Sequence, residues 1–119
     1  MTNLRWLKWA TAKHFRDKGL RVQMRSIKLG NVAIDGEVLG KGWRMALELK
    51  TPQDDITRGI GQLSEALVYG YNQVALVTTL RAAKKIDSAV FDKLGLVLLG
   101  VDSKGIVQQV YPTYAVRAQ

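Results

Sequence analysis

Mostly apolar residues near the start of the chain recur at the spacing of an α-helix. Between residues 4 and 18 they form one stripe, made by Leu4, Leu7, Thr11, His14 and Phe15. This spacing predicts an amphipathic helix over residues 4–18. We expect Gly19 to end it, because glycine favours the backbone conformation that follows a helix.

After Gly19 the hydrophobic pattern changes to alternation. Residues 20–28, 32–38 and 43–50 alternate between apolar and polar side chains, as strands with one buried face do. Glycine-containing turns separate them, at Gly30-Asn31 and at residues 40–42. Short turns of this kind join antiparallel neighbours, so we expect an antiparallel meander of three strands.

A helix is predicted to follow the third strand. Thr51 and Pro52 are typical of a helix start, with Thr51 as the N-cap and Pro52 in the first helical position. Apolar residues then recur at helical spacing as far as Tyr71.

The remaining segments alternate between strands and a helix. Residues 73–79 and 96–101 are nearly all apolar, which is typical of strands buried on both faces. Residues 81–94 predict a helix between them, and residues 106–111 predict a last strand.

The order of these elements indicates the fold class. Buried strands joined through a helix pair in parallel, whereas the first three strands pair antiparallel. We therefore predict one α/β domain over residues 1–119, with a mixed β-sheet flanked by helices. A chain of 119 residues with 47% hydrophobic residues is large enough for one such core.

Positive charge gathers near the N-terminus. The formal net charge is +8, and residues 1–30 hold eight Lys or Arg residues against Asp17 alone, while the rest of the chain holds ten basic and nine acidic residues. Such a basic segment is typical of polyanion binding, and we expect DNA as the partner. A solvated basic face is the alternative. The candidate phosphate contacts are Arg5, Lys8, Lys13, Arg16 and Arg25.

Two tryptophans lie among these basic residues. Trp6 and Trp9 would either stack on nucleic-acid bases or pack the first helix against the core.

The composition also excludes several kinds of site. The chain has no Cys, which excludes disulfides, thiolate metal sites and cysteine nucleophiles. No apolar run approaches the roughly 20 residues that span a bilayer, and the N-terminal segment lacks the apolar core of a signal peptide. We expect no membrane partner and an intracellular protein, cytoplasmic or associated with the nucleoid.

Three charged residues stand out within the predicted strands. Glu48 and Lys50 are two residues apart, so their side chains leave the strand on the same face. Asp35 comes near them if residues 32–38 and 43–50 pair across the Gly40 turn. Two carboxylates suit Mg²⁺, which takes few protein ligands beside water and substrate phosphate. An ion-pair cluster is the alternative, although such a cluster is costly unless it is well paired.

This arrangement resembles the signature of the PD-(D/E)XK nuclease superfamily. Here it reads Ile34-Asp35, twelve intervening residues, then Glu48-Leu49-Lys50, with Ile34 where the family name has Pro. The predicted order over residues 4–79 is similar to the αβββαβ core of this restriction-endonuclease-like fold, and residues 81–111 would form a C-terminal αββ extension. Small single-domain Holliday-junction resolvases and recombination exonucleases are the nearest members.

The resemblance implies a metal-dependent DNA endonuclease that hydrolyses phosphodiester bonds. Asp35, Glu48 and the backbone carbonyl of Leu49 would bind Mg²⁺ or Mn²⁺. Lys50 would position or activate the attacking water, or stabilise charge on the phosphate. Gln62, in the next helix, resembles a glutamine that many members carry near the site; a solvent-facing polar residue is its alternative.

The resemblance leaves part of the site open. Resolvase-like members often carry a Glu in the first helix, but this helix has none, and His14 and Asp17 are the only candidates there. A junction-resolving enzyme must cut two strands symmetrically, which implies a homodimer. The alternatives are a non-catalytic nucleic-acid-binding module, and the nuclease subunit of a larger restriction, transposition or recombination complex.

Overall fold

A six-stranded sheet runs through the middle of the computed structural model, which describes residues 3–113 apart from the side chain of Ser88. The three central strands are parallel, and the outer ones pair antiparallel. Across the sheet the strands are β1 (Arg21–Gln23), β4 (Gly36–Gly40), β5 (Trp43–Leu49), β6 (Gln73–Thr79), β7 (Val97–Val101) and β8 (Val107–Tyr111).

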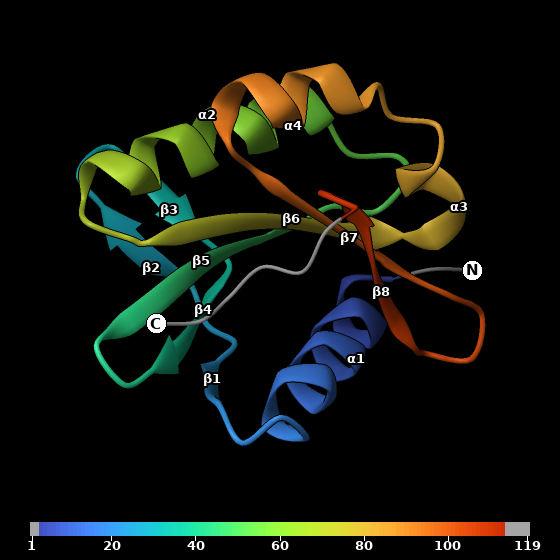
Figure 1. Ribbon diagram of the computed structural model, residues 1–119, viewed down its shortest axis with the longest axis horizontal. Coiled ribbons are helices and arrows are strands. Elements are labelled where there is room, and N and C mark those ends of the chain that lie inside the picture. Colours follow the sequence, from blue (N-terminus) through green and yellow to red (C-terminus); the bar gives the residue numbers. More distant parts are fainter. Residues whose placement is uncertain (1–2, 114–119) are drawn as a thin grey trace.

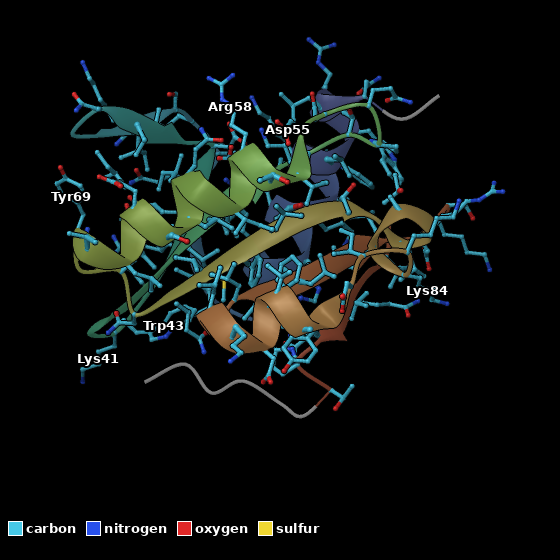
Figure 2. The ribbon with its side chains drawn as sticks, turned by 90° about the horizontal axis from the view of Figure 1, so that it is seen from above. Lys41, Trp43, Asp55, Arg58, Tyr69 and Lys84 are labelled. Atoms are coloured by element: carbon cyan, nitrogen blue, oxygen red, sulfur yellow. The ribbon has the colours of Figure 1, made fainter. Side chains whose placement is uncertain are left out.

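Helices cover both faces of this sheet (Figure 1). On one face lies α1 (Leu4–Arg16), and on the other lie α2 (Ile56–Val68) and α4 (Ser88–Leu94). Figure 2 looks onto the second face, where α2 and α4 flank β6. The predicted α/β class with a mixed sheet is thereby confirmed, and the architecture is compatible with a restriction-endonuclease-like core.

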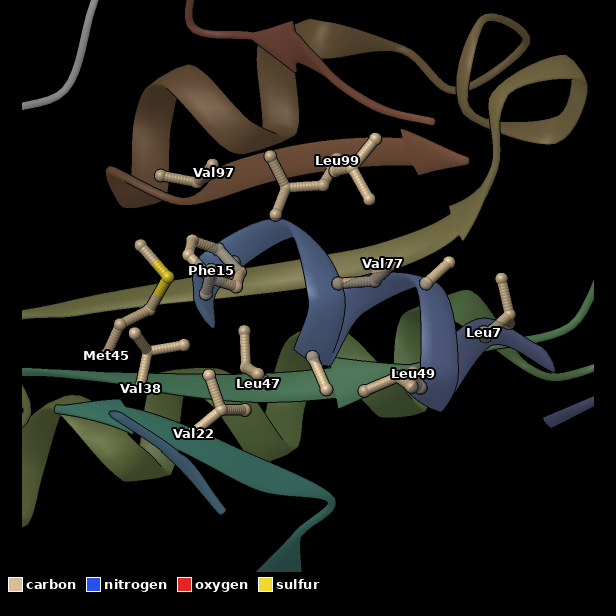
Figure 3. Close-up of a cluster of buried hydrophobic side chains, with 14 of the residues drawn as sticks. Leu7, Phe15, Val22, Val38, Met45, Leu47, Leu49, Val77, Val97 and Leu99 are labelled. Carbon is tan, nitrogen blue, oxygen red and sulfur yellow. The ribbon is translucent and has the colours of Figure 1, made fainter. Parts of the chain in front are cut away.

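The strand pleat divides the core into two parts. Met45, Leu47 and Leu49 of β5 face α1, where they pack with Leu7 and Phe15 (Figure 3). The alternate residues of the same strand face α2, as two-residue alternation requires. There Ala46 packs with Leu63 and Ala66 of α2 and with Val74 and Leu76 of β6.

The predicted three-strand meander is wrong in part, because its first two strands are each broken. Residues 20–28 divide into β1 and β2 (Ile27–Leu29), and residues 32–38 divide into β3 (Val32–Ile34) and β4. The hairpin of β2 and β3 forms a small sheet of its own. At the break a side chain on Gly36 would meet the carbonyl oxygen of Gln23 at 2.7 Å, so only glycine permits this close passage.

The predicted start of the helix after β5 is also wrong. The N-cap of α2 is Asp55, whose side chain accepts a hydrogen bond from the backbone N–H of Arg58. Thr51 instead begins a tight turn, in which the carboxylate of Asp54 accepts from both the N–H and the hydroxyl of Thr51. These bonds hold residues 51–54 outside the helix.

The single helix predicted over residues 81–94 is two helices. The first is α3 (Leu80–Ala83), whose N-cap Thr79 accepts a hydrogen bond from the N–H of Ala82. Asp87 caps α4 in the same way. Each cap favours its own helix start, so the chain turns between them. Within residues 3–113, no helix is long and apolar enough to cross a membrane.

Candidate active site

Strand β5 and the residue after it bring a carboxylate and an ammonium group together. Glu48 is 2% exposed and points toward α2, on the face that also carries Ala46. Lys50 follows the strand, and its Nζ lies 3.5 Å from Oε2 of Glu48. The two side chains therefore share a face, as the alternation of residues 43–50 predicts.

Asp35 occupies the bend between β3 and β4. Regular pairing of β4 with β5 ends at Gly36 and Leu47, and the N–H of Asp35 donates to the carbonyl of Leu47 at 3.0 Å. The next N–H of β5 on that side is that of Leu49, and it donates to Oδ2 of Asp35 at 2.8 Å. The carboxylate thus takes the place of a strand carbonyl, which fixes Asp35 beside β5.

The carboxyl of Glu48 has a strongly raised pKa. Burial raises the pKa of its carboxyl to about 8, and the negative charge of Asp35 adds to this rise, while Lys50 opposes it. Oε1 of Glu48 is buried and has no hydrogen-bond partner among the described residues. A buried carboxylate oxygen without a partner is unfavourable unless a cation or donor completes it.

Helix α2 closes the site from above the sheet. Gly59 is buried against the side chain of Lys50, and a Cβ there would lie 2.8 Å from Cε of that lysine. One turn later, Nε2 of Gln62 donates to the carbonyl of Ala33 at 2.9 Å, while its Oε1 is buried without a partner among the described residues. The small residue gives Lys50 its space, and the glutamine ties α2 to the β3 end of the site.

Thr78 is a residue at this site that the sequence analysis missed. It is fully buried in β6, and its hydroxyl has no partner among the described residues. Leu49 pairs with Val77, so Thr78 lies on the strand next to Lys50. Two threonines at the end of an otherwise apolar strand were the only sequence signal.

The donor set fits a hard divalent cation. Asp35 and Glu48 supply carboxylate oxygens, and one oxygen of Glu48 lacks a partner. No group of three or more His, Asp or Glu side chains suited to a metal occurs in residues 3–113. Any cation here would therefore depend on two carboxylates together with backbone oxygen, water and phosphate, which is how proteins usually bind Mg²⁺.

The predicted phosphate contacts do not gather around Glu48. Helix α1 packs on the opposite face of the sheet, and three of its exposed basic residues are Arg5, Lys13 and Arg16. Lys13 pairs with Asp17 at 2.8 Å. Arg16 donates to the carbonyl of Val22.

The other two predicted phosphate contacts are also separate from the site carboxylates. Lys8 is half-buried on α1, and Arg25 donates to Oε1 of Gln23 between β1 and β2. Neither candidate for an additional ligand reaches Glu48. His14 packs edge-on against Phe15 on the α1 side, and Asp17 is held by Lys13.

Comparison with known proteins gives likeness in structure only. No protein-family model and no curated protein matches the sequence. Among solved structures, SPO1766, a protein of unknown function from Silicibacter pomeroyi, superposes over 100% of this chain and 75% of its own, with a TM-score of 0.70 and 16% identity.

Two further neighbours have descriptions that bear on function. An fdxN element excision controlling factor from Anabaena variabilis matches with a TM-score of 0.60 and 15% identity, over 89% of this chain and 98% of its own. Pyrococcus furiosus SfsA, in complex with Ca²⁺, matches with a TM-score of 0.59 and 14% identity, over 91% and 63%. At such identities these neighbours show a shared fold and nothing about activity.

The raised pKa of Glu48 predicts how stability depends on pH in metal-free protein. In the unfolded chain a Glu titrates near pH 4.3, whereas folded Glu48 keeps its proton up to about pH 8. Between these values the folded state binds one more proton, so stability falls as pH rises, by at most about 1.4 kcal/mol per pH unit. Glu48→Gln should remove this fall.

The measurement is thermal or urea unfolding in EDTA between pH 5 and pH 8, with exposed Glu65→Gln in α2 as the matched control. The pKa of His14 is lowered by burial, so His14 acts in the opposite sense, favouring stability as pH rises. The difference in free energy of unfolding between the parent and Glu48→Gln therefore reports the contribution of Glu48, because His14, Asp35 and Lys50 are present in both proteins. Parallel pH profiles for the two proteins would contradict the prediction.

Proposed function

We propose that this protein is a metal-dependent nuclease that hydrolyses phosphodiester bonds in DNA. The observation that carries the proposal is the buried Glu48, set between Asp35 and Lys50 with one oxygen unpartnered. A purely structural ion pair would leave that oxygen desolvated, a cost in folding free energy that no interaction of the oxygen offsets. A cation at the two carboxylates accounts for it and restores the ionised form of Glu48.

Each residue of the site then has a separate role. Asp35 and Glu48 would hold Mg²⁺ or Mn²⁺, with the backbone carbonyl of Leu49 as a third ligand. When bound, the ion supplies positive charge that stabilises the transition state of phosphodiester hydrolysis. Lys50, kept near Glu48 by the space at Gly59, positions the attacking water or stabilises charge on the phosphate. Gln62 assists by holding α2 against β3.

Two further observations support this assignment. The formal net charge of +8 favours association with a polyanion such as DNA. One structural neighbour is described in complex with Ca²⁺, and another is named for the excision of an element. By likeness to these proteins, we extend divalent-cation binding and action on DNA to this chain.

The proposal includes a homodimer and a branched DNA substrate such as a four-way junction. A domain of this size has one site, and symmetric cutting of two strands needs two copies. Sedimentation equilibrium should give twice the mass of the 13.2 kDa chain. A junction should be cut faster than a linear duplex of the same sequence. A monomer that cuts every substrate alike would remove this part of the proposal.

Three conservative substitutions test the catalytic assignment. Asp35→Asn and Glu48→Gln remove a negative charge while keeping shape, so they should greatly weaken Mg²⁺ or Mn²⁺ binding in isothermal titration. Lys50→Met keeps the apolar stem that packs on Gly59 and removes the charge. It should lower the rate of DNA cleavage by about a hundredfold or more, the usual scale for losing a charge-stabilising group.

Lys41→Met, at an exposed turn, is the matched control and should cut at the parent rate. DNA affinity of Lys50→Met should stay near the parent value, because one contact among many is lost. A folded Lys50→Met protein with parental cleavage would refute the nuclease assignment. DNA binding without cleavage in the parent, with any divalent metal, would favour the non-catalytic module.

The space at Gly59 gives a second test of Lys50. In Gly59→Ala the new Cβ would lie 2.8 Å from Cε of Lys50 and 3.1 Å from Cδ1 of Leu76. The flexible end of Lys50 can move aside, so the protein should fold, with its ammonium group displaced from Glu48. A displacement of about 1 Å can lower a rate on the order of a hundredfold.

Gly61→Ala in the same helix is the control, since nothing lies within 4 Å of its Cβ. It should leave cleavage unchanged and raise stability by about 0.5–1 kcal/mol, because alanine favours helix. Equal cleavage by the two alanine variants would show that the position of Lys50 is not critical.

A further inference from the structure

A groove opens where the parallel strands β5 and β6 end. Two hollows of about 540 and 430 Å³ adjoin there, and both are walled by Pro52, Thr79 and Arg81. Pro52 is two residues beyond Lys50, so the groove begins within about 7 Å of that residue along the chain. Thr79 follows Thr78, which lies beside Lys50 in the sheet. The groove therefore begins within two residues of Lys50 along the chain and within one residue of Thr78 along β6, although no proposed site residue lines it.

Positive charge lines this groove. Arg81 and Lys84 border the larger hollow, and Lys85 borders the smaller one together with Arg81. All three are exposed, and within residues 3–113 no carboxylate forms an ion pair with any of them. Among the described residues that line the walls, the one acidic side chain is Asp102, which accepts hydrogen bonds from backbone N–H groups of its own turn. The groove thus keeps an excess of cations free for an anion.

An aromatic side chain stands in the wall of the larger hollow. Trp6, from the first turns of α1, is half-buried; it packs partly against the α1-side core and also lines the groove. An indole in a cationic groove is the usual means of holding single-stranded nucleic acid, because a base stacks on the ring while the cations follow the phosphates. A duplex offers no free base face to such a ring.

We propose that this groove holds a single-stranded stretch of the nucleic-acid substrate, next to the phosphodiester at Lys50. Arg81, Lys84 and Lys85 contact its phosphates, and Trp6 stacks on one of its bases. The inference rests on the proposed nuclease function for the placement of the scissile phosphate. It also moves the main nucleic-acid contact from the predicted α1 residues to the loop around α3. The substrate class that follows is a strand with unpaired nucleotides beside the cut.

The test measures binding without cleavage, in the full chain carrying Lys50→Met and in EDTA. Fluorescence anisotropy would follow a labelled single-stranded oligonucleotide and a blunt duplex of the same sequence. The groove variant combines Arg81→Gln, Lys84→Gln and Lys85→Gln. The control combines Lys18→Gln, Lys28→Gln and Lys41→Gln, which removes equal charge from exposed positions elsewhere. Figure 2 shows Lys41 and Lys84 at opposite ends of the molecule.

The groove variant should bind the single strand about tenfold or more weakly than the control variant does. For the groove variant, the slope of log binding constant against log salt concentration should be shallower by about 2 than that of the parent. Each of the three lost phosphate contacts accounts for roughly 0.7 of this slope on a single strand. Trp6→Leu should weaken single-strand binding about fivefold or more and leave duplex binding unchanged. Trp9→Leu, at a ring that is 55% exposed, is its control and should change neither.

Equal weakening by the groove and control variants would overturn the proposal, and so would a Trp6→Leu effect that is the same for duplex and single strand. The two proposals fail separately. If the parent cuts no DNA with Mg²⁺ or Mn²⁺ while the groove variant loses single-strand binding, the nuclease function is refuted and the binding groove is supported. If the parent cuts DNA while the groove variant binds the single strand as the control does, only the proposed binding groove is refuted.

Discussion

The candidate site depends on one backbone N–H that the sheet leaves without a strand partner. Strand β4 begins to pair with β5 only at Gly36, opposite Leu47, so no carbonyl of that strand reaches the N–H of Leu49. A buried N–H without a partner costs about 1–3 kcal/mol, and the carboxylate of Asp35 removes this cost by accepting it. The same bond that completes the sheet therefore also brings Asp35 next to Glu48.

The burial of Glu48 limits which groups can lie near its carboxyl. Glu48 is buried beside the sheet, and among the described residues its ionised form pairs only with Lys50. Lys50 reaches it because Gly59 leaves room in α2. The basic helix α1 contributes no charge here, since the sheet separates it from Glu48. A count of charges along the chain cannot reveal this separation, because it depends on which face of the sheet each helix covers.

The fold and the central pair follow from sequence where local rules decide. The pleat of a strand alone places Glu48 and Lys50 on one face and Leu49 on the other. The break at Asp35 was not predictable, since it depends on Gly36 passing the carbonyl of Gln23, a contact between segments distant in the chain. The start of α2 was mispredicted because Thr51 and Asp55 are both good N-caps, and the Asp54 carboxylate decided between them.

The place of α1 in the core has a consequence for the order of folding during synthesis. This helix is made before the strands of the sheet, yet its apolar face packs against Val97 and Leu99 of β7 and Val107 of β8, which are made well after it. Its docking surface is complete only when β8 has left the ribosome, so the nascent chain carries α1 with part of that face exposed. The dense positive charge of residues 1–30 favours solubility of α1 before β7 and β8 are available. Repulsion between such segments also disfavours association of one nascent chain with another.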